Sequence, residues 1–385
     1  MLKHQERWIH PSGNRVDIFT SESVCAGHPD KICDSISDAI LDEVLKQDKF
    51  GRVAVETLAG FNMVVIAGEV TTKVKLDYKK IARERIRELG YTHPSFNFSD
   101  KSLIQVFIHE QSPEIAKGVK PEGAGDQGMM FGFACRETES YMPLPITLAH
   151  GLSEKLDAVK KDLLYLLPDG KTQATVEYKN GRPYKVSHVV VAVPHDKKVK
   201  LSEVAEDIYK KVVTEILGEY GFKISKKELI VNGTGVWHNP GPASDSGLTG
   251  RKIVVDTYGG YSRVGGGAFS GKDPTKVDRS GAYAARFIAK NIVAEKLADK
   301  AEVRLAYFIG AKKPLMQDVE TFGTAKKSDA VIKSFMSKIL DTSVAGIIDG
   351  LSLRRPIYLK TSTYGHFGRE IFPWEKIKSN IPNAS

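Results

Sequence analysis

The sequence has few cysteines and no long apolar run. Its three cysteines (Cys25, Cys33 and Cys135) cannot all pair, and they show no metal-ligand spacing. We therefore expect a reducing, cytoplasmic environment rather than a disulfide-bonded secreted fold. No run approaches the ~20 apolar residues that span a bilayer, and no apolar stretch follows the charged residues near the start, as in a secretory signal peptide. We expect no membrane partner.

The sequence also lacks the residue orders of two common catalytic classes. It contains no Ser-His-Asp order and no zinc-type His/Cys cluster, and its ten histidines are scattered. The formal net charge of +9 is spread along the chain, without a run that alternates with stacking aromatics. Such an excess suits either nucleic acid or a polyanionic small substrate. The length of 385 residues and the hydrophobic content of 41% predict two or three domains with real cores.

The segment 265–280 combines glycines, lysines and aspartates directly before a helical pattern. Glycine lets backbone N–H groups approach an anion closely, and a helix N-terminus supplies partial positive charge. Lys272 and Lys276 would neutralise phosphate, whereas Asp278 among phosphates needs a cation beside it. The segment therefore predicts a polyphosphate site with a bound divalent metal.

Two familiar nucleotide motifs are matched only in part. Residues 266–272 satisfy G-x-x-x-x-G-K, but Asp273 stands where a P-loop needs Ser or Thr for magnesium. Residues 123–128 satisfy G-x-G-x-x-G, but they follow Lys-Pro-Glu rather than a strand. We therefore reject a Walker-type NTPase and a dinucleotide site. Taken alone, 123–128 reads as a surface loop.

A helix, a strand pair, a second helix and a strand recur three times along the chain. Apolar spacings of three and four predict long helices beginning near 29, 144 and 278. Asn180-Gly181 is a strong hairpin signal. The predicted strand pairs are 53–58 with 63–71, 172–178 with 184–193, and 302–309 with 315–322. The later helices are 77–89, 202–217 and 328–340, and the closing strands are 103–110, 228–231 and a weaker candidate at 357–358; a further strand is expected at 253–256.

This repeat predicts an α+β fold. We expect three structurally similar domains related by a pseudo-threefold repeat, each a mixed sheet covered on one face by helices. Their predicted bounds are 16–113, 123–243 and 244–382. The uncovered faces would pack on each other or on a second subunit. Loops rich in glycine and charge, at 21–31, 123–132 and 259–278, precede the three long helices and suggest one composite site.

Some polar residues have both a structural and a functional reading. Pro29 suits the first position of a helix, so His28 would point from the helix N-terminus towards a bound anion. Asp30 lies in the first turn, where it could cap the helix or, together with Asp278, hold magnesium on a phosphate chain. Glu56 lies in an apolar run and is costly there unless it faces water, a cation or a donor.

Other charged residues fall in or next to predicted turns. Arg251 and Lys252 follow Gly247-Leu248-Thr249-Gly250, and Lys171 lies close to a loop. Each such cation is, taken singly, an ordinary surface charge. Asp245 is by default a turn residue, and Glu69 lies in the first hairpin. These residues alone do not define a reaction.

Together these strings resemble the S-adenosylmethionine synthetase family. The resemblance is carried, in family order from about 16 to 376, by residues 19–24, 27–31, 123–128, 247–260, 265–280 and 364–369. It implies that the methionine sulfur attacks ribose C5′ of ATP and that the released tripolyphosphate is hydrolysed to pyrophosphate and phosphate. It also implies Mg²⁺ and K⁺ as cofactors. Active sites would be shared within a homodimer, often paired further as a homotetramer.

The resemblance also implies a role for individual residues. His28 would lie on the leaving oxygen. The catalytic set is His28, Lys171, Arg251 and Lys272. The ATP contacts are His28, Asp169, Lys171, Trp237, Asp245, Arg251, Lys252, Ala268 and Lys272. The methionine contacts are Glu69, Gln111, Asp245 and Lys276. The metal ligands are Asp30 and Asp278 for Mg²⁺ and Glu56 for K⁺.

The chain departs from the family pattern in two places. Val236 and Trp237 stand where the family usually has arginine and phenylalanine, which affects the expected adenine contacts. Residues 112–122, which correspond to a mobile lid, are fewer than in many members.

Three rival functions make different predictions. A kinase or acyl-adenylate ligase would leave a phosphoryl or adenylyl group on its product. A nucleic-acid module would bind with strong salt dependence, but Asp273 and Asp278 would repel a nucleic-acid backbone, so we expect no nucleic-acid partner. An inactive family member is disfavoured by the retained His28, Asp30 and Lys272.

Overall fold

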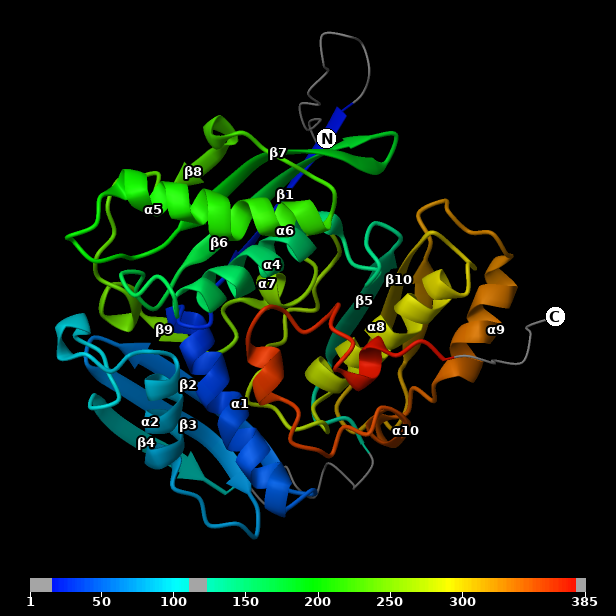
Figure 1. Cartoon of the computed structure of the whole chain (residues 1–385). Coiled ribbons are helices and arrows are strands. Elements are labelled where there is room, and N and C mark those ends of the chain that lie inside the picture. Colours follow the sequence, from blue (N-terminus) through cyan, green and yellow to red (C-terminus); the bar gives the residue numbers. More distant parts are fainter. Residues whose placement is uncertain (1–15, 111–122, 379–385) are drawn as a thin grey trace, which may run out of the picture.

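The chain forms three sheets, each with helices on one face (Figure 1). The computed structural model describes residues 16–110 and 123–378. Three similar α+β units make up the fold, which confirms the predicted fold class. One apolar core joins the first and third units, and a separate core lies in the central unit. Among the described residues, no helix is long and apolar enough to cross a membrane.

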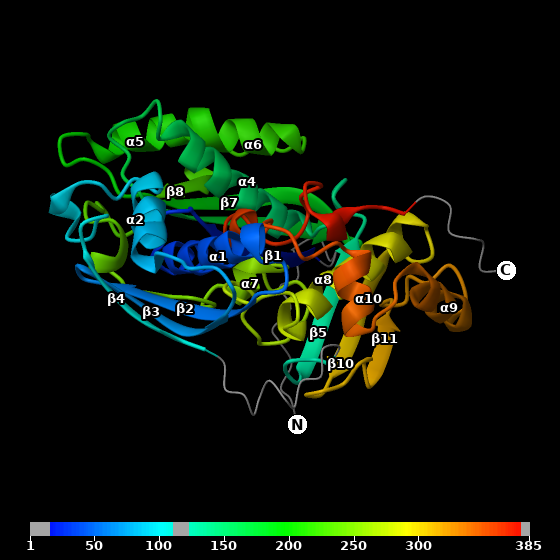
Figure 2. The same cartoon turned by 90° about the horizontal axis from the view of Figure 1, so that it is seen from below.

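The first sheet has the strand order β4-β3-β2-β9. The hairpin of β2 (Arg52–Gly60) and β3 (Met63–Thr71) continues to β4 (Leu103–His109), and the short β9 (Gly247–Leu248) pairs with β2. Alternate residues of β2 are buried, as expected for a sheet with one covered face. Helices α1 (Pro29–Gln47) and α2 (Tyr78–Glu88) lie on that covered side (Figure 2).

The central sheet has the order β1-β6-β7-β8. The predicted turn Asn180-Gly181 joins β6 (Lys171–Lys179) to β7 (Arg182–Ala192) with positive φ at both residues, as a tight hairpin turn requires. The outer strands are β1 (Val16–Val24) and β8 (Leu229–Val231). The covering helices are α4 (Leu144–Val159), α5 (Leu201–Ile208) and α6 (Thr214–Glu219), with a π-helical turn Tyr209–Val213 between the last two.

The third sheet has the order β11-β10-β5. Its strands are β5 (Gly128–Cys135), β10 (Lys300–Tyr307) and β11 (Met316–Glu320). Its helices are α8 (Val277–Ala294), α9 (Asp329–Ile339) and α10 (Val344–Gly350). Short 3₁₀ helices span Pro94–Phe96, Lys226–Glu228, Gly241–Ala243, Leu359–Ser362 and Pro373–Glu375.

Two predicted strands are wrong. The candidate at 357–358 is not a strand, because the N–H groups of Tyr358 and Leu359 donate to the Asp42 carboxylate and a 3₁₀ turn follows. Residues 253–256 form a helical turn, α7 (Ile253–Asp256). The Asp256 N–H donates to the Lys252 carbonyl at 2.8 Å, and Thr257 Oγ1 donates to the Ile253 carbonyl. This local bonding outweighs the strand propensity of the β-branched run.

Three strands cross between the units. β1 pairs with β6 of the central sheet, β5 with β10 of the third, and β9 with β2 of the first. Figure 1 shows β1, in blue, among the green strands of the central unit. The sequence pattern did not predict these strands. The predicted domain bounds of 16–113, 123–243 and 244–382 remain predictions. Each sheet includes one strand that lies outside the residue range predicted for its domain.

The outer face of the first sheet stays exposed. Leu58, Leu103 and Phe107 are 38%, 59% and 60% exposed. In Figure 2 this sheet forms one layer whose outer side faces away from the rest of the molecule. In the described part of the chain, this uncovered face therefore does not pack on either of the other sheets.

Candidate active site

The first group of site residues gathers at the start of α1. His28 is the N-cap residue, and its Nδ1 accepts a hydrogen bond from the Asp30 N–H at 3.2 Å. Because Nδ1 accepts, we assign the ring proton to Nε2. The side chain is only 1% exposed, and Nε2 has no hydrogen-bond partner among the described residues. A buried, unsatisfied N–H donor therefore lies at a helix N-terminus.

Burial and neighbouring cations keep this imidazole neutral. Burial lowers the pKa of His28, and the charges of Lys252 and Lys171 lower it further, to about 3. Lys171, exposed at the start of β6, therefore lies close enough to His28 to affect its charge. At neutral pH the uncharged ring can therefore donate a hydrogen bond from Nε2 to a bound group.

Asp30 binds the segment that carries two predicted phosphate ligands. Its carboxylate accepts from Lys252 Nζ at 2.5 Å and from Leu248 N–H at 3.0 Å, and Arg251 Nε lies 3.5 Å away. Burial acts to raise the pKa of Asp30, but the hydrogen bonds from Lys252 and Leu248 outweigh it and hold the pKa below its ordinary value. Asp30 thus stays ionised and fixes both cations beside His28.

A second group forms where residues 268–278 cross the edge of β2. Lys272 Nζ lies 2.5 Å from Asp278 Oδ2, and Lys276 Nζ lies 2.6 Å from Asp273 Oδ2. Asp273 also accepts from Val53 N–H at 2.8 Å. Gly271 has φ +78°, and a Cβ there would lie 1.9 Å from a backbone oxygen of β2, so the crossing requires glycine.

A pocket of about 240 Å³ brings further predicted residues to this second group. Glu56 of β2 and Glu69 of β3 line it together with Ala268 and Lys272. The Glu69 carboxylate also lies 3.4 Å from His109 Nε2. The carboxylates proposed for methionine and potassium therefore share one pocket with a proposed phosphate ligand.

Asp169 is buried and binds the loop 237–245, which carries the predicted residues Trp237 and Asp245. Its carboxylate accepts from Gly170 N–H and Gly241 N–H at 2.7 and 3.0 Å, and burial raises its pKa to about 6. Asp245 is exposed, and Trp237 Nε1 donates to the Asn239 carbonyl at 2.7 Å. Neither Trp237 nor Asp245 lines the 240 Å³ pocket. Gln111 lies outside the described residues.

The three glycine-rich loops divide between the two groups. Residues 27–31 pack on 247–252, whereas Gly125 and Gly128 lie close to Thr275 and Asp278. The groups meet where a Cβ on Gly250 would lie 2.4 Å from the Ala268 Cβ. Within the described chain, the expected composite site therefore takes the form of two adjoining charged groups.

Comparisons with known proteins decide the family. Models of the N-terminal, central and C-terminal domains of S-adenosylmethionine synthetase match residues 16–113, 121–237 and 240–376. The S-adenosylmethionine synthase of Brachyspira hyodysenteriae is 53% identical over 95% of this chain and 98% of its own length. Those of Clostridium tetani and Clostridium botulinum are 50% and 49% identical over 94% of this chain and 97% of theirs. The chain belongs to the S-adenosylmethionine synthetase family.

S-adenosylmethionine synthetases are adenosyltransferases that need metal ions. Among residues 16–110 and 123–378, no group of three or more His, Cys, Asp or Glu side chains is arranged to hold a metal. Any ion at Asp30 or Asp278 would therefore take most of its ligands from phosphate oxygens and water. Magnesium binds in this way, through one or two carboxylates together with substrate phosphates, so the donor set fits it.

Sequence reasoning missed a ladder of carboxylates on α1 in this synthetase. Asp34, Asp38 and Asp42 follow Asp30 at intervals of four residues, and all are buried. Each accepts a backbone N–H from a residue more than 200 positions later in the chain: Gly250, Gly271 and Tyr358. Aspartates repeated every four residues beside an apolar stripe were the signal that could have identified them.

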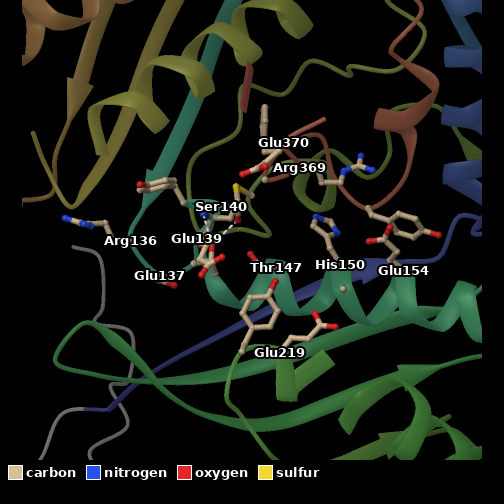
Figure 3. A pocket seen from close by; sticks show the side chains of 18 residues that line it. Arg136, Glu137, Glu139, Ser140, Thr147, His150, Glu154, Glu219, Arg369 and Glu370 are labelled. Carbon is tan, nitrogen blue, oxygen red and sulfur yellow. Dashed lines mark hydrogen bonds between the residues drawn. The ribbon is translucent and has the colours of Figure 1, made fainter. Parts of the chain in front are cut away.

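A larger cavity lies elsewhere in the synthetase. It has a volume of about 1020 Å³ and lies between α4, the segment before it and residues 364–370. Several glutamates surround it, namely Glu137, Glu139, Glu154, Glu219 and Glu370 (Figure 3). None of the described residues that the sequence analysis assigned to the site lines this cavity.

Proposed function

We propose that the chain makes S-adenosylmethionine from ATP, L-methionine and water. The methionine sulfur displaces the tripolyphosphate at ribose C5′, and the tripolyphosphate is then hydrolysed to pyrophosphate and phosphate. The observation that carries this proposal is the neutral, unpartnered Nε2–H of His28 between Lys171 and Lys252. Such a donor suits an oxygen on which negative charge develops.

His28 would stabilise the departing oxygen by hydrogen bonding. A neutral thioether is a modest nucleophile, so the barrier falls chiefly through orientation and through stabilisation of the leaving polyanion. Because His28 is already oriented by the Asp30 N–H, little reorganisation is needed when charge develops. Its pKa of about 3 argues against general acid catalysis by an imidazolium.

Four cations would hold the polyphosphate. We assign this clamp to Lys171, Arg251, Lys252 and Lys272. Lys252 and Lys272 each pair with an aspartate in the chain, Asp30 and Asp278. These aspartates would hold Mg²⁺, which supplies positive charge to the phosphates when bound. Glu56 would serve as the K⁺ ligand.

The remaining residues would hold the two organic parts of the substrates. For methionine we assign Glu69, Gln111, Asp245 and Lys276, with Asp245 on its ammonium group and Lys276 on its carboxylate. For ATP we assign Asp169, Trp237, Asp245 and Ala268. Trp237 is only partly buried, so its indole face can stack on adenine.

We also propose a homodimer with shared active sites, paired further into a homotetramer. The pocket with Glu56 and Glu69 opens on the outer side of the first sheet, where Leu58, Leu103 and Phe107 are exposed. A second subunit on this face would bury apolar surface and complete the site. The three free, buried cysteines are compatible with a reducing cytoplasm.

The test is a reaction with ATP, L-methionine, Mg²⁺ and K⁺, followed by chromatography of the sulfonium product and by phosphate assay. The proposal predicts methionine-dependent S-adenosylmethionine with equal amounts of pyrophosphate and phosphate. Consumption of ATP without a sulfonium product would contradict it and favour phosphoryl or adenylyl transfer.

A further inference from the structure

The buried carboxylates Asp34, Asp38 and Asp42 of α1 each hold a different segment between residues 250 and 359. Asp34 and Asp38 are fully buried, and Asp42 is 6% exposed. Removing a carboxylate from water is costly unless charged or hydrogen-bonded partners compensate. The partners of Asp34 and Asp38 belong to the segments that carry the proposed phosphate clamp, whereas those of Asp42 do not.

Asp34 fixes the turn that presents Arg251 and Lys252. Its Oδ1 accepts from the Gly250 N–H at 2.8 Å, and its Oδ2 lies 3.0 Å from Lys31 Nζ. Lys31 in turn lies 2.5 Å from Asp256 Oδ1, at the other end of the same turn. The backbone on both sides of the two cations is therefore bound to α1.

Asp38 fixes the backbone around Lys272. Its Oδ1 accepts from the Gly271 N–H at 2.9 Å, and Arg279 donates to both its oxygens at 2.7 and 3.0 Å. Arg279 also donates to the Lys272 carbonyl at 3.2 Å and to Thr361 Oγ1 at 2.8 Å. A planar guanidinium can hold these partners together in a way that an ammonium group cannot.

We propose that Asp34 and Asp38 are positioning residues that set, within each chain, the two groups of cations that the chain contributes to phosphate clamps. Asp34 acts through Arg251 and Lys252, and Asp38 acts through Arg279 on Lys272. This inference rests on the proposed function, since it assigns the clamp to those cations. A displacement of about 1 Å in such groups can cost about a hundredfold in rate.

Asp42 provides a matched control on the same helix. It accepts from the N–H groups of Tyr358 and Leu359 at 3.0 and 2.9 Å. It is thus a buried aspartate with two backbone partners, but the segment that it holds carries no proposed site residue. A purely structural ladder would make all three aspartates equivalent in function.

The experiment compares Asp34→Asn, Asp38→Asn and Asp42→Asn in the full chain. Thermal melting is measured first, then affinity for inorganic tripolyphosphate with Mg²⁺ by calorimetry, and then kcat and KM for ATP. We expect the first two variants to lose at least about tenfold in tripolyphosphate affinity and Asp42→Asn less than about twofold, even where all three melt at similar temperatures. Equal effects in all three variants would overturn the proposal.

A double-mutant cycle tests whether Asp34 acts through Lys252. In a Lys252→Met background, Asp34→Asn should weaken tripolyphosphate binding far less than in the wild type. Additive losses would contradict the positioning role. If Asp38→Asn does not fold, Arg279→Lys tests the same link, because lysine keeps the charge but lacks the planar two-nitrogen fork that holds both Asp38 oxygens.

Binding without turnover separates this inference from the proposed function. A wild type that binds tripolyphosphate but makes no S-adenosylmethionine, with the predicted losses in the variants, would overturn the function and support the positioning roles. An active wild type in which Asp34→Asn and Asp38→Asn bind as tightly as Asp42→Asn would overturn only the positioning. A wild type that binds no tripolyphosphate would overturn the clamp and its positioning together.

Discussion

The charged groups at α1 and at 268–278 differ sharply from the larger cavity beside α4. The pocket at Lys272 has about 240 Å³, whereas the cavity has about 1020 Å³. In the smaller region, Lys252 and Lys272 are partly buried and paired with aspartates. In the cavity, the side chains of four exposed glutamates face open space, and Arg369 is bound to backbone carbonyls.

Preorganised charge, rather than volume, therefore distinguishes the proposed site from the cavity. An acidic cavity repels a polyanion, whereas paired cations beside an unsatisfied buried donor attract one. His28, Lys252 and Lys272, to which the resemblance assigned roles, lie in the smaller region, whereas residues 364–369 of the same resemblance border the cavity.

The largest effect is expected for Lys272→Met. The substitution removes a cation from the leaving polyphosphate and leaves the Asp278 carboxylate without its partner. We expect a loss of about 10³-fold in kcat/KM for ATP, in the range for loss of one stabilising group at a developing charge. Steady-state assays of product formation measure it.

Lys333→Met is the matched control for that loss. Lys333 also pairs with an aspartate, at 3.0 Å from Asp329, but it is 49% exposed on α9. Solvent and salt screen an exposed pair of this kind, so it contributes little to stability and activity should not change. Similar kinetic losses in both variants would mean that the contrast between the two regions is wrong.

The next largest effect is expected for His28→Ala, at about 10²-fold in kcat. Because burial and nearby cations hold the pKa of His28 near 3, the ring is neutral across pH 5–9. The wild-type pH profile of kcat/KM should therefore show no step near pH 6.5 that belongs to His28. A step at that pH that disappears in His28→Ala would contradict the neutral-donor role.

The same pKa predicts a trend in stability. The folded chain keeps His28 unprotonated while the unfolded chain takes up a proton below about pH 6.5, so stability is lost as the pH falls from about 6.5 towards 3. Urea titrations of the wild type and His28→Ala at several pH values measure this. The loss between pH 6.5 and 4.5 should be smaller in the variant. An unchanged loss would argue against a depressed pKa.

Trp237→Phe should have a moderate effect. Aromatic contacts contribute ~0.5–1.5 kcal/mol beyond area, so we expect KM for ATP to change by less than about tenfold. The ratio of activity with ATP to that with GTP should change as well. An unaltered KM and an unaltered ratio would remove Trp237 from the proposed adenine contacts.

The smallest effect is expected in the large cavity. The double substitution Glu154→Gln with Glu219→Gln should change kcat/KM by less than about twofold, because neither residue belongs to the proposed site. Surface substitutions of this kind change the free energy of unfolding by roughly 0.5 kcal/mol or less, so the fold should also be kept. The same assay as for Lys272→Met measures kcat/KM. A tenfold loss would move the functional site towards the cavity.

Local pattern predicted the covered hairpins and long helices, but not the strands that cross between units. In β2, buried residues such as Val53 and Val55 alternate with exposed ones, and the partner strand follows directly. The strand β5 has no such alternation, and its partner β10 lies more than 150 residues away. Periodicity within a window carries no information about such a partner. Hydrogen bonds to Asp42 likewise kept Tyr358 out of a strand.

The sequence predicted the placement of His28 and Asp30 at a helix start, because Pro29 marks the first helical position. The pairing of Asp30 with Lys252 was not predictable, because the two residues are 222 positions apart. Nor were the roles of Asp34 and Asp38, since buried aspartates are recognised only when their distant backbone partners are seen. Gln111 remains a prediction outside the described residues.

The most direct test of the account is a crystal structure of the full chain with Mg²⁺, L-methionine and a non-hydrolysable ATP analogue. We expect a polyphosphate within hydrogen-bonding distance of His28 Nε2, Lys252 and Lys272, with these residues contributed by the two subunits of the proposed homodimer. A nucleotide in the cavity beside α4, with the two lysines still paired only to Asp30 and Asp278, would contradict it.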